Sequence, residues 1–104
     1  MSRWTVNTPP NVEDLIEEQV LYIARHSVDN ALAWEARLRL AVRSLVDTPM
    51  LSIDPDASQR MSRTVRKLTF EKTYLVHYWL DDAASIIRVV GFRHGARLPR
   101  PGEP

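Results

Sequence analysis

Six side chains in the last third of the chain are of types that do chemistry on anions. They are Arg66, Lys67, Arg88, Arg93, His94 and Arg97. Arginine and lysine can stabilise the charge of a developing phosphorane, and histidine can give or take a proton near neutral pH. The same cations can instead bind a carboxylate or phosphate without any reaction. The set therefore allows either phosphodiester cleavage or the binding of an acidic partner.

Three runs of β-branched and aromatic residues must position these side chains. They cover residues 65–70, 73–80 and 85–92, with polar breaks at 71–72 and 81–84. Such residues favour the half-buried surface of a sheet, and breaks of about two to five residues suit hairpins. The pattern predicts an antiparallel meander of three strands, which places the cations on a rigid surface.

Alternation along each run predicts which side chains share a face. In the middle run, one face carries Tyr74, Val76, Tyr78 and Leu80, and the other Leu75, His77 and Trp79. In the last run, one face carries Ile87, Val89, Gly91 and Arg93, and the other Ile86, Arg88, Val90 and Phe92. Both faces of the central strand are largely apolar, so one face is expected to be covered and the other to be partly shielded.

The first half of the chain predicts a short edge strand at residues 3–7 and two amphipathic helices at residues 12–25 and 30–47. Thr8 or Asn11 could cap the first helix, and Ser27 or Asp29 the second. Residues 50–62 show no sustained periodicity and are expected to form a loop. The predicted fold class is α+β, with a helical hairpin packed on a small antiparallel sheet in the order β-α-α-β-β-β.

Length and composition narrow the class of protein. A chain of 104 residues that is 44% hydrophobic suits one globular domain, here residues 1–97, with residues 98–104 as a mobile tail. The absence of cysteine excludes disulfides and thiolate metal sites, and three scattered histidines predict no metal site and no cofactor. There is no apolar stretch typical of a membrane span or signal peptide, so a cytoplasmic location is expected.

Charge is divided unevenly between the two halves. Residues 1–59 carry five Lys or Arg and nine Asp or Glu, a balance of −4, whereas residues 60–104 carry nine and four, a balance of +5. A basic half can attract nucleic acid or an acidic protein. Ordinary solvated surface charge is the alternative interpretation.

The order of elements resembles the ParE/RelE toxin superfamily of type II toxin–antitoxin systems. The resemblance covers residues 3–97 and rests on order and spacing. Its pieces are the acidic helix around Glu13, the helix through Trp34, the strand YLVHY at residues 74–78, and a last strand that leads into His94-Gly95-Ala96-Arg97.

The resemblance implies a growth-inhibiting toxin that a cognate antitoxin protein neutralises. RelE-like members cut mRNA on the ribosome, whereas ParE-like members, linked to plasmid stabilisation, inhibit DNA gyrase and are not regarded as nucleases. Tyr74 stands where several nuclease relatives carry Arg, and Gly95 where they often carry an aromatic residue. These departures favour the ParE-like branch, with a RelE-like endonuclease as the alternative. A non-toxic interaction domain on the same fold is the third possibility.

Site residues follow from these alternatives. A nuclease would use Arg66, Lys67, Arg88 and His94, although a lone histidine after a strand is commonly structural. A gyrase inhibitor would contact its target through Arg93, His94 and Arg97. The antitoxin would contact Tyr74, Tyr78, Trp79 and Arg66, unless these aromatic residues belong to the core. His77 is interpreted as a sheet histidine and His26 as a helix end.

Overall fold

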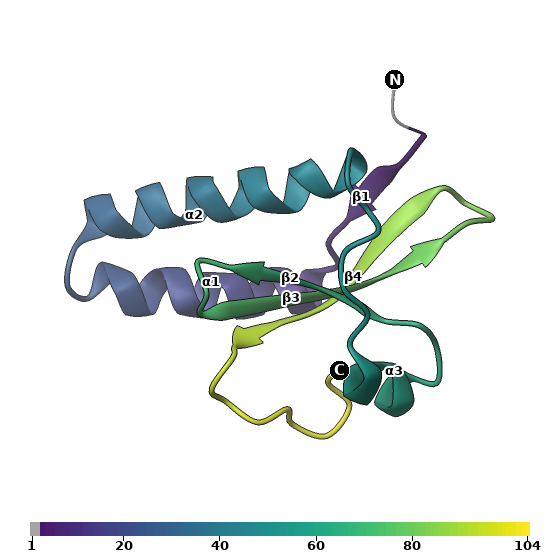
Figure 1. Cartoon of the computed structure of the whole chain (residues 1–104). Coiled ribbons are helices and arrows are strands. Elements are labelled where there is room, and N and C mark those ends of the chain that lie inside the picture. Colours follow the sequence, from purple (N-terminus) through teal and green to yellow (C-terminus); the bar gives the residue numbers. More distant parts are fainter. Residues whose placement is uncertain (1–2) are drawn as a thin grey trace.

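The computed structural model describes residues 3–104, and its strands and helices follow the predicted order with one additional short helix (Figure 1). The strands are β1 (Thr5–Asn7), β2 (Arg66–Phe70), β3 (Tyr74–Asp81) and β4 (Ile86–His94). The helices are α1 (Pro10–Ala24), α2 (Val28–Arg43) and α3 (Pro55–Met61), and a 3-10 turn, η1 (Ser44–Val46), extends α2. The α+β class is confirmed.

The four strands form one sheet in the order β1-β4-β3-β2. The pairs β2–β3 and β3–β4 are antiparallel, as the meander predicts. Strand β1 lies at the edge but runs parallel to β4, so the expectation of a wholly antiparallel sheet is wrong. A parallel neighbour is possible because the long connection through the helices, β2 and β3 carries the chain back to the same end of the sheet.

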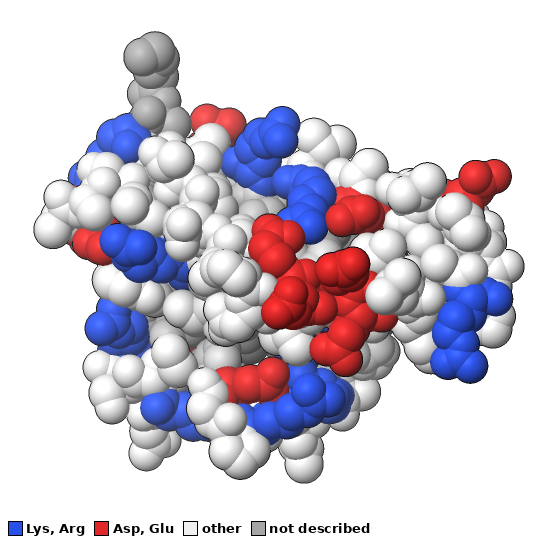
Figure 2. All heavy atoms as spheres, turned by 180° about the vertical axis from the view of Figure 1, so that it is seen from behind, with Lys and Arg blue, Asp and Glu red and all other residues white. Residues whose placement is uncertain are grey.

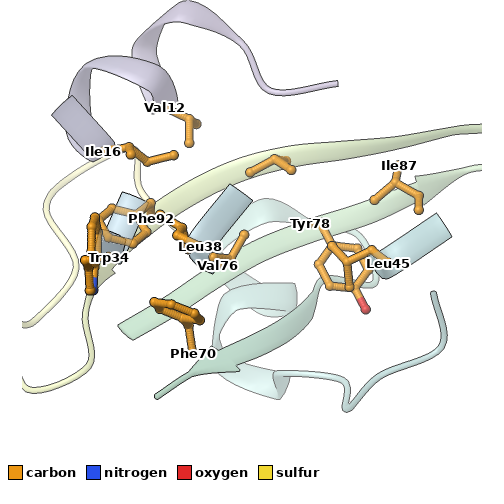
Figure 3. Packing of buried hydrophobic residues seen from close by; sticks show 11 residues of the cluster. Val12, Ile16, Trp34, Leu38, Leu45, Phe70, Val76, Tyr78, Ile87 and Phe92 are labelled. Atoms are coloured by element: carbon orange, nitrogen blue, oxygen red, sulfur yellow. The ribbon is translucent and has the colours of Figure 1, made fainter. Parts of the chain in front are cut away.

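The helical hairpin α1–α2 covers one face, called here the inner face. Its residues pack with inward side chains of β2, β3 and β4 (Figure 3). The core combines Val12 and Ile16 of α1, Trp34 and Leu38 of α2, and the following strand residues: Phe70, Val76, Tyr78, Ile87, Val89 and Phe92. Each helix thus buries one apolar stripe against the sheet, as the prediction of two amphipathic helices requires.

Helix caps agree only in part with the sequence prediction. Ser27 caps α2, since its hydroxyl accepts a hydrogen bond from Asn30 N–H at 3.1 Å. Neither Thr8 nor Asn11 caps α1, because the helix begins with Pro9 at the cap position and Pro10 in the first turn. Proline has no N–H that a cap would need to satisfy, and its fixed φ suits the first turn.

Helix α3 replaces the loop expected at residues 50–62. Asp54 begins it by accepting a hydrogen bond from Ala57 N–H at 3.1 Å, and Pro55 follows in the first turn. Seven residues make two turns, which is too short for an amphipathic period to be recognisable. The helix lies against the other face of the sheet, the outer face, where it covers Val65 and His77.

A β-bulge in β4 changes the predicted alternation. His77 pairs with Gly91 and Tyr78 with Val89, so the register skips Val90. Phe92 therefore joins Ile87 and Val89 in the core, whereas the sequence pattern had placed it on the opposite face. One inserted residue exchanges the faces of everything that follows it. The bulge thus turns Arg93 outward and His94 toward α1.

No helix in the described part of the chain is long and apolar enough to cross a membrane.

Candidate functional site

Basic side chains gather where β4 ends. Arg93, His94, Arg97 and Arg100 line a cavity of about 260 Å³ together with Leu15, Glu18, Gln19, Tyr22 and Phe92. The cavity lies between α1 and the chain that leaves the sheet. In Figure 2 acidic side chains fill the centre of this side of the molecule, and basic ones lie along the edge below. The three residues predicted to contact a target are thus brought together.

His94 presents a hydrogen-bond donor. Its Nδ1 accepts a hydrogen bond from Ala96 N–H at 3.1 Å, so in the neutral ring the proton is on Nε2. The ring centroids of His94 and Tyr74 lie 5.5 Å apart in a T-shaped arrangement, and the Tyr74 ring stacks on Phe92. Tyr74 is further fixed by a hydrogen bond from Gln19 Nε2 at 3.1 Å. The His94 side chain is therefore exposed, but its contact with Tyr74, which packs against the core, fixes its orientation.

Arg93 and Arg97 shape the segment that follows β4. The Arg93 guanidinium donates to the carbonyl oxygen of Arg97, and burial lowers the pKa of Arg93 below that of a free arginine. Arg97 donates to both carboxylate oxygens of Glu103, at 3.0 and 3.3 Å. Both guanidinium groups thus have partners within the chain, whereas no side-chain hydrogen bond or ion pair is described for Arg100.

Three of the predicted nuclease residues lie away from His94. Arg66 donates to the carbonyl of Leu51 at 2.7 Å and so supports the loop before α3. Arg88 pairs with Asp81 at 2.8 Å near the β3–β4 turn, and this hydrogen bond lowers the pKa of Asp81. Since β4 rises about 3.3 Å per residue, Arg88 and His94 lie roughly 20 Å apart along the strand.

Lys67, the fourth nuclease candidate, points to the outer face, because alternation sets it opposite the core-facing Leu68. It lies near Asp54 and contributes to the low pKa of that carboxyl. The four candidates are therefore spread over both faces and both ends of the sheet. They do not form a single site.

The residues predicted to contact an antitoxin differ in exposure. Tyr78 is fully buried, with its hydroxyl donating to Pro49 O at 2.7 Å, so its assignment as a surface contact is corrected to a core residue. Trp79 is half-buried on the outer face, with the Arg63 guanidinium 3.8 Å from its ring centroid. The side chain of Tyr74 is likewise half-buried, beside the cavity.

His77 is buried in the sheet, where its Nε2 lies 2.9 Å from Asp54 Oδ2. Burial lowers the pKa of His77, although Asp54 acts in the opposite direction. The ring is therefore neutral at pH 7. Within residues 3–104 no cluster of acidic and histidine side chains has the arrangement of a metal site.

When the chain is compared with known proteins, no protein-family model and no curated sequence matches it.

Sequence reasoning missed several residues at or beside the cavity. Arg100 is a further arginine three residues after Arg97, but it lies in the segment predicted to be a tail. Glu18 and Tyr22 come from α1, and only the tertiary fold brings them to the cavity. Glu103 carries no local signal, because its role depends on an ion pair with Arg97.

Proposed function

We propose that the chain is the toxin of a type II toxin–antitoxin pair and that it inhibits growth by binding its target, DNA gyrase, in the cytoplasm. The order of elements supports this, since a helical hairpin on a sheet followed by a basic segment after the last strand is what the resemblance to ParE-like toxins implies. A cognate antitoxin protein is the second partner, and no small-molecule cofactor is needed.

One observation favours a binding mechanism over RNA cleavage. The cations that a nuclease would need lie apart, while Arg93, His94, Arg97 and Arg100 surround one cavity. Acid–base catalysis requires the acid, base and charge-stabilising groups within hydrogen-bonding reach of one substrate. A group of cationic donors around one cavity suits recognition of an anionic group on a protein surface.

Induced expression in a bacterial host tests the proposal. Growth should stop, DNA-damage reporters should switch on, and translating mRNA should keep intact 5′ ends. The purified chain should inhibit supercoiling by gyrase and leave relaxation by topoisomerase I unchanged. Ribosome-dependent cuts within codons would replace the proposal with the endonuclease. Unchanged growth, with no stable complex with the product of the adjacent reading frame, would contradict both.

A further inference from the structure

The end of the described chain folds back over the outer face of the sheet. Figure 1 shows the C-terminal segment looping from β4 until its end lies beside α3. Glu103 and Pro104 occupy a small site on the sheet, here called the tail seat, which is lined by His77, Gly91, Phe92 and Arg93. A cavity of about 450 Å³ separates the preceding residues of the tail from Arg60 and Met61 of α3. The last two residues are thus packed closely and the approach to them is open.

The carboxylate of Glu103 is held beside the tail seat by two residues of the segment that follows β4. Arg97 presents two N–H groups to it, and the backbone N–H of Arg100 adds a third hydrogen bond at 2.8 Å. Burial opposes ionisation, but these donors outweigh it and lower the pKa of Glu103. A planar guanidinium fork recognises a carboxylate in two places at once. The arrangement is therefore that of a carboxylate-binding site.

Pro104 fills the space above Gly91. It is buried, and a methyl group at Gly91 would come within 2.7 Å of the proline ring. Glycine at this position lets the ring of Pro104 lie directly against the backbone of β4, so the sheet surface accepts a closely packed chain segment here.

Two polar atoms beneath this proline lack partners. His77 Nδ1 and Arg93 Nε are both buried and neither has a hydrogen bond. Asp54 can only accept, so His77 Nε2 carries the ring proton and Nδ1 needs a donor. Arg93 Nε carries a proton and needs an acceptor.

The space there is too small for a water molecule, and proline has no N–H to donate. Leaving a buried donor or acceptor unpaired is unfavourable, so Pro104 is an imperfect occupant of this site. An unpaired acceptor and an unpaired donor on residues that line the same small site can complement the N–H and C=O groups of a peptide segment.

We propose that the tail seat is a binding site for an extended, acidic segment of a partner protein, and that Glu103 and Pro104 occupy it in competition with that segment. An Asp or Glu of the partner binds Arg97. The following residue donates its N–H to His77 Nδ1, and a carbonyl of the segment accepts from Arg93 Nε. A nucleic-acid phosphate would also bind Arg97 but has no N–H for His77. The basic side chains of Arg60 and Arg100 border the approach and favour an acidic segment.

Competition sets the expected affinity. A partner binds only the fraction of molecules in which the site is open. If the tail occupies its seat about 90% of the time, the apparent affinity falls about tenfold. Releasing the tail should therefore tighten binding by about the same factor.

Purified full-length protein and a fluorescent peptide, Leu-Pro-Arg-Pro-Gly-Glu-Ala, test this. The peptide repeats the tail but ends in alanine, which supplies the missing N–H. Glu103→Lys should bind it about tenfold more tightly than the wild type. The double variant Glu103→Lys/Arg97→Gln should lose this tenfold gain in affinity. A peptide in which Gln replaces Glu should bind Glu103→Lys poorly. The matched control is Glu71→Lys, which breaks the surface ion pair with Arg37 and should bind as the wild type does.

A second measurement reports on the peptide unit itself. In Glu103→Lys, addition of the peptide should shift the ¹⁵N resonance of His77 Nδ1, as expected when that atom accepts a hydrogen bond. Equal binding by the wild type and Glu103→Lys, or an unmoved His77 resonance, would overturn the proposal. So would an oligonucleotide of equal charge that competes as well as the acidic peptide. These results do not depend on growth arrest, so they stand or fall separately from the toxin proposal.

Discussion

The inner and outer faces of the sheet are covered in different ways. The inner face meets two long helices and buries a continuous cluster of aliphatic and aromatic side chains. The outer face meets the seven residues of α3 and the tail, and at its centre is a buried histidine bonded to an aspartate. The inner face therefore owes its stability to apolar area, whereas the outer face depends on a few directional contacts. Regions of the second kind open more easily and more often carry function.

The largest expected effect is on the inner face. Leu38→Ala removes a fully buried side chain and should lower the free energy of unfolding by about 3 kcal/mol. Leu40→Ala, two residues along the same helix, is the matched control, because Leu40 is 63% exposed. Urea denaturation followed by circular dichroism measures both. Equal losses for the two variants would mean that the inner face is not the main source of stability.

This face was also the part of the fold that the sequence predicted best. The helices and the three meander strands have repeated apolar spacings over many residues, which packing on a sheet requires. Helix α3 is too short for such a pattern, and Val90 in the bulge is β-branched like Val89 before it, so the run reads as a regular strand. Arg93, His94 and Arg97 come together because they are near in sequence. Glu18, Tyr22 and Glu103 join them only through contacts that no local pattern encodes.

A somewhat smaller loss of stability is expected when the polar centre of the outer face is disrupted. Asp54→Ala removes the cap of α3 and the hydrogen-bond partner of His77 together. The free energy of unfolding should fall by about 2 kcal/mol, because a helix cap contributes about 1 kcal/mol and leaving a buried polar group unpaired costs at least as much. Asp56→Ala changes an exposed carboxyl of the same helix and should cost little. A loss in Asp54→Ala no larger than this control, measured by denaturation, would show that the pair does not stabilise the outer face.

Acidification should weaken the outer face before the inner one. The folded protein holds His77 neutral with a lowered pKa, so the unfolded chain binds a proton more readily. The stabilisation is therefore complete above the ordinary histidine pKa of about 6.5 and is lost as the pH falls below it. Asp54, whose folded pKa is also lowered, adds a loss only nearer pH 4.

Between pH 7.5 and 5.5 the free energy of unfolding should fall because of His77, by at most about 1.4 kcal/mol for each pH unit below the ordinary histidine pKa. His77→Gln cannot take up the proton, so its stability should change less over the same range. Urea midpoints at the two pH values measure the difference. If the urea midpoints of the wild type and of His77→Gln change equally between the two pH values, the pH dependence comes from other groups.

The smallest expected effect on global stability concerns the tail. Gly91→Ala places a methyl group against Pro104 and should expel it from its seat. The change in the free energy of unfolding should stay below about 1 kcal/mol, because the core does not use the tail. Trypsin should then cut more rapidly after Arg97. An unchanged rate of cleavage would show that the tail is not stabilised by packing on the sheet.

The central claim is that the basic end of the sheet contacts the target while the inner face only stabilises the fold. The double variant His94→Ala/Arg100→Gln tests it directly, since neither side chain forms a described hydrogen bond or ion pair with Glu103 or Pro104. Its control, Arg43→Gln/Lys72→Gln, removes two exposed cations that do not line the cavity. Growth after induction and the melting temperature are measured on both. The double variant should lose growth arrest with a melting temperature within about 4 °C of the wild type, and the control should arrest growth fully. Full arrest by His94→Ala/Arg100→Gln would contradict the claim.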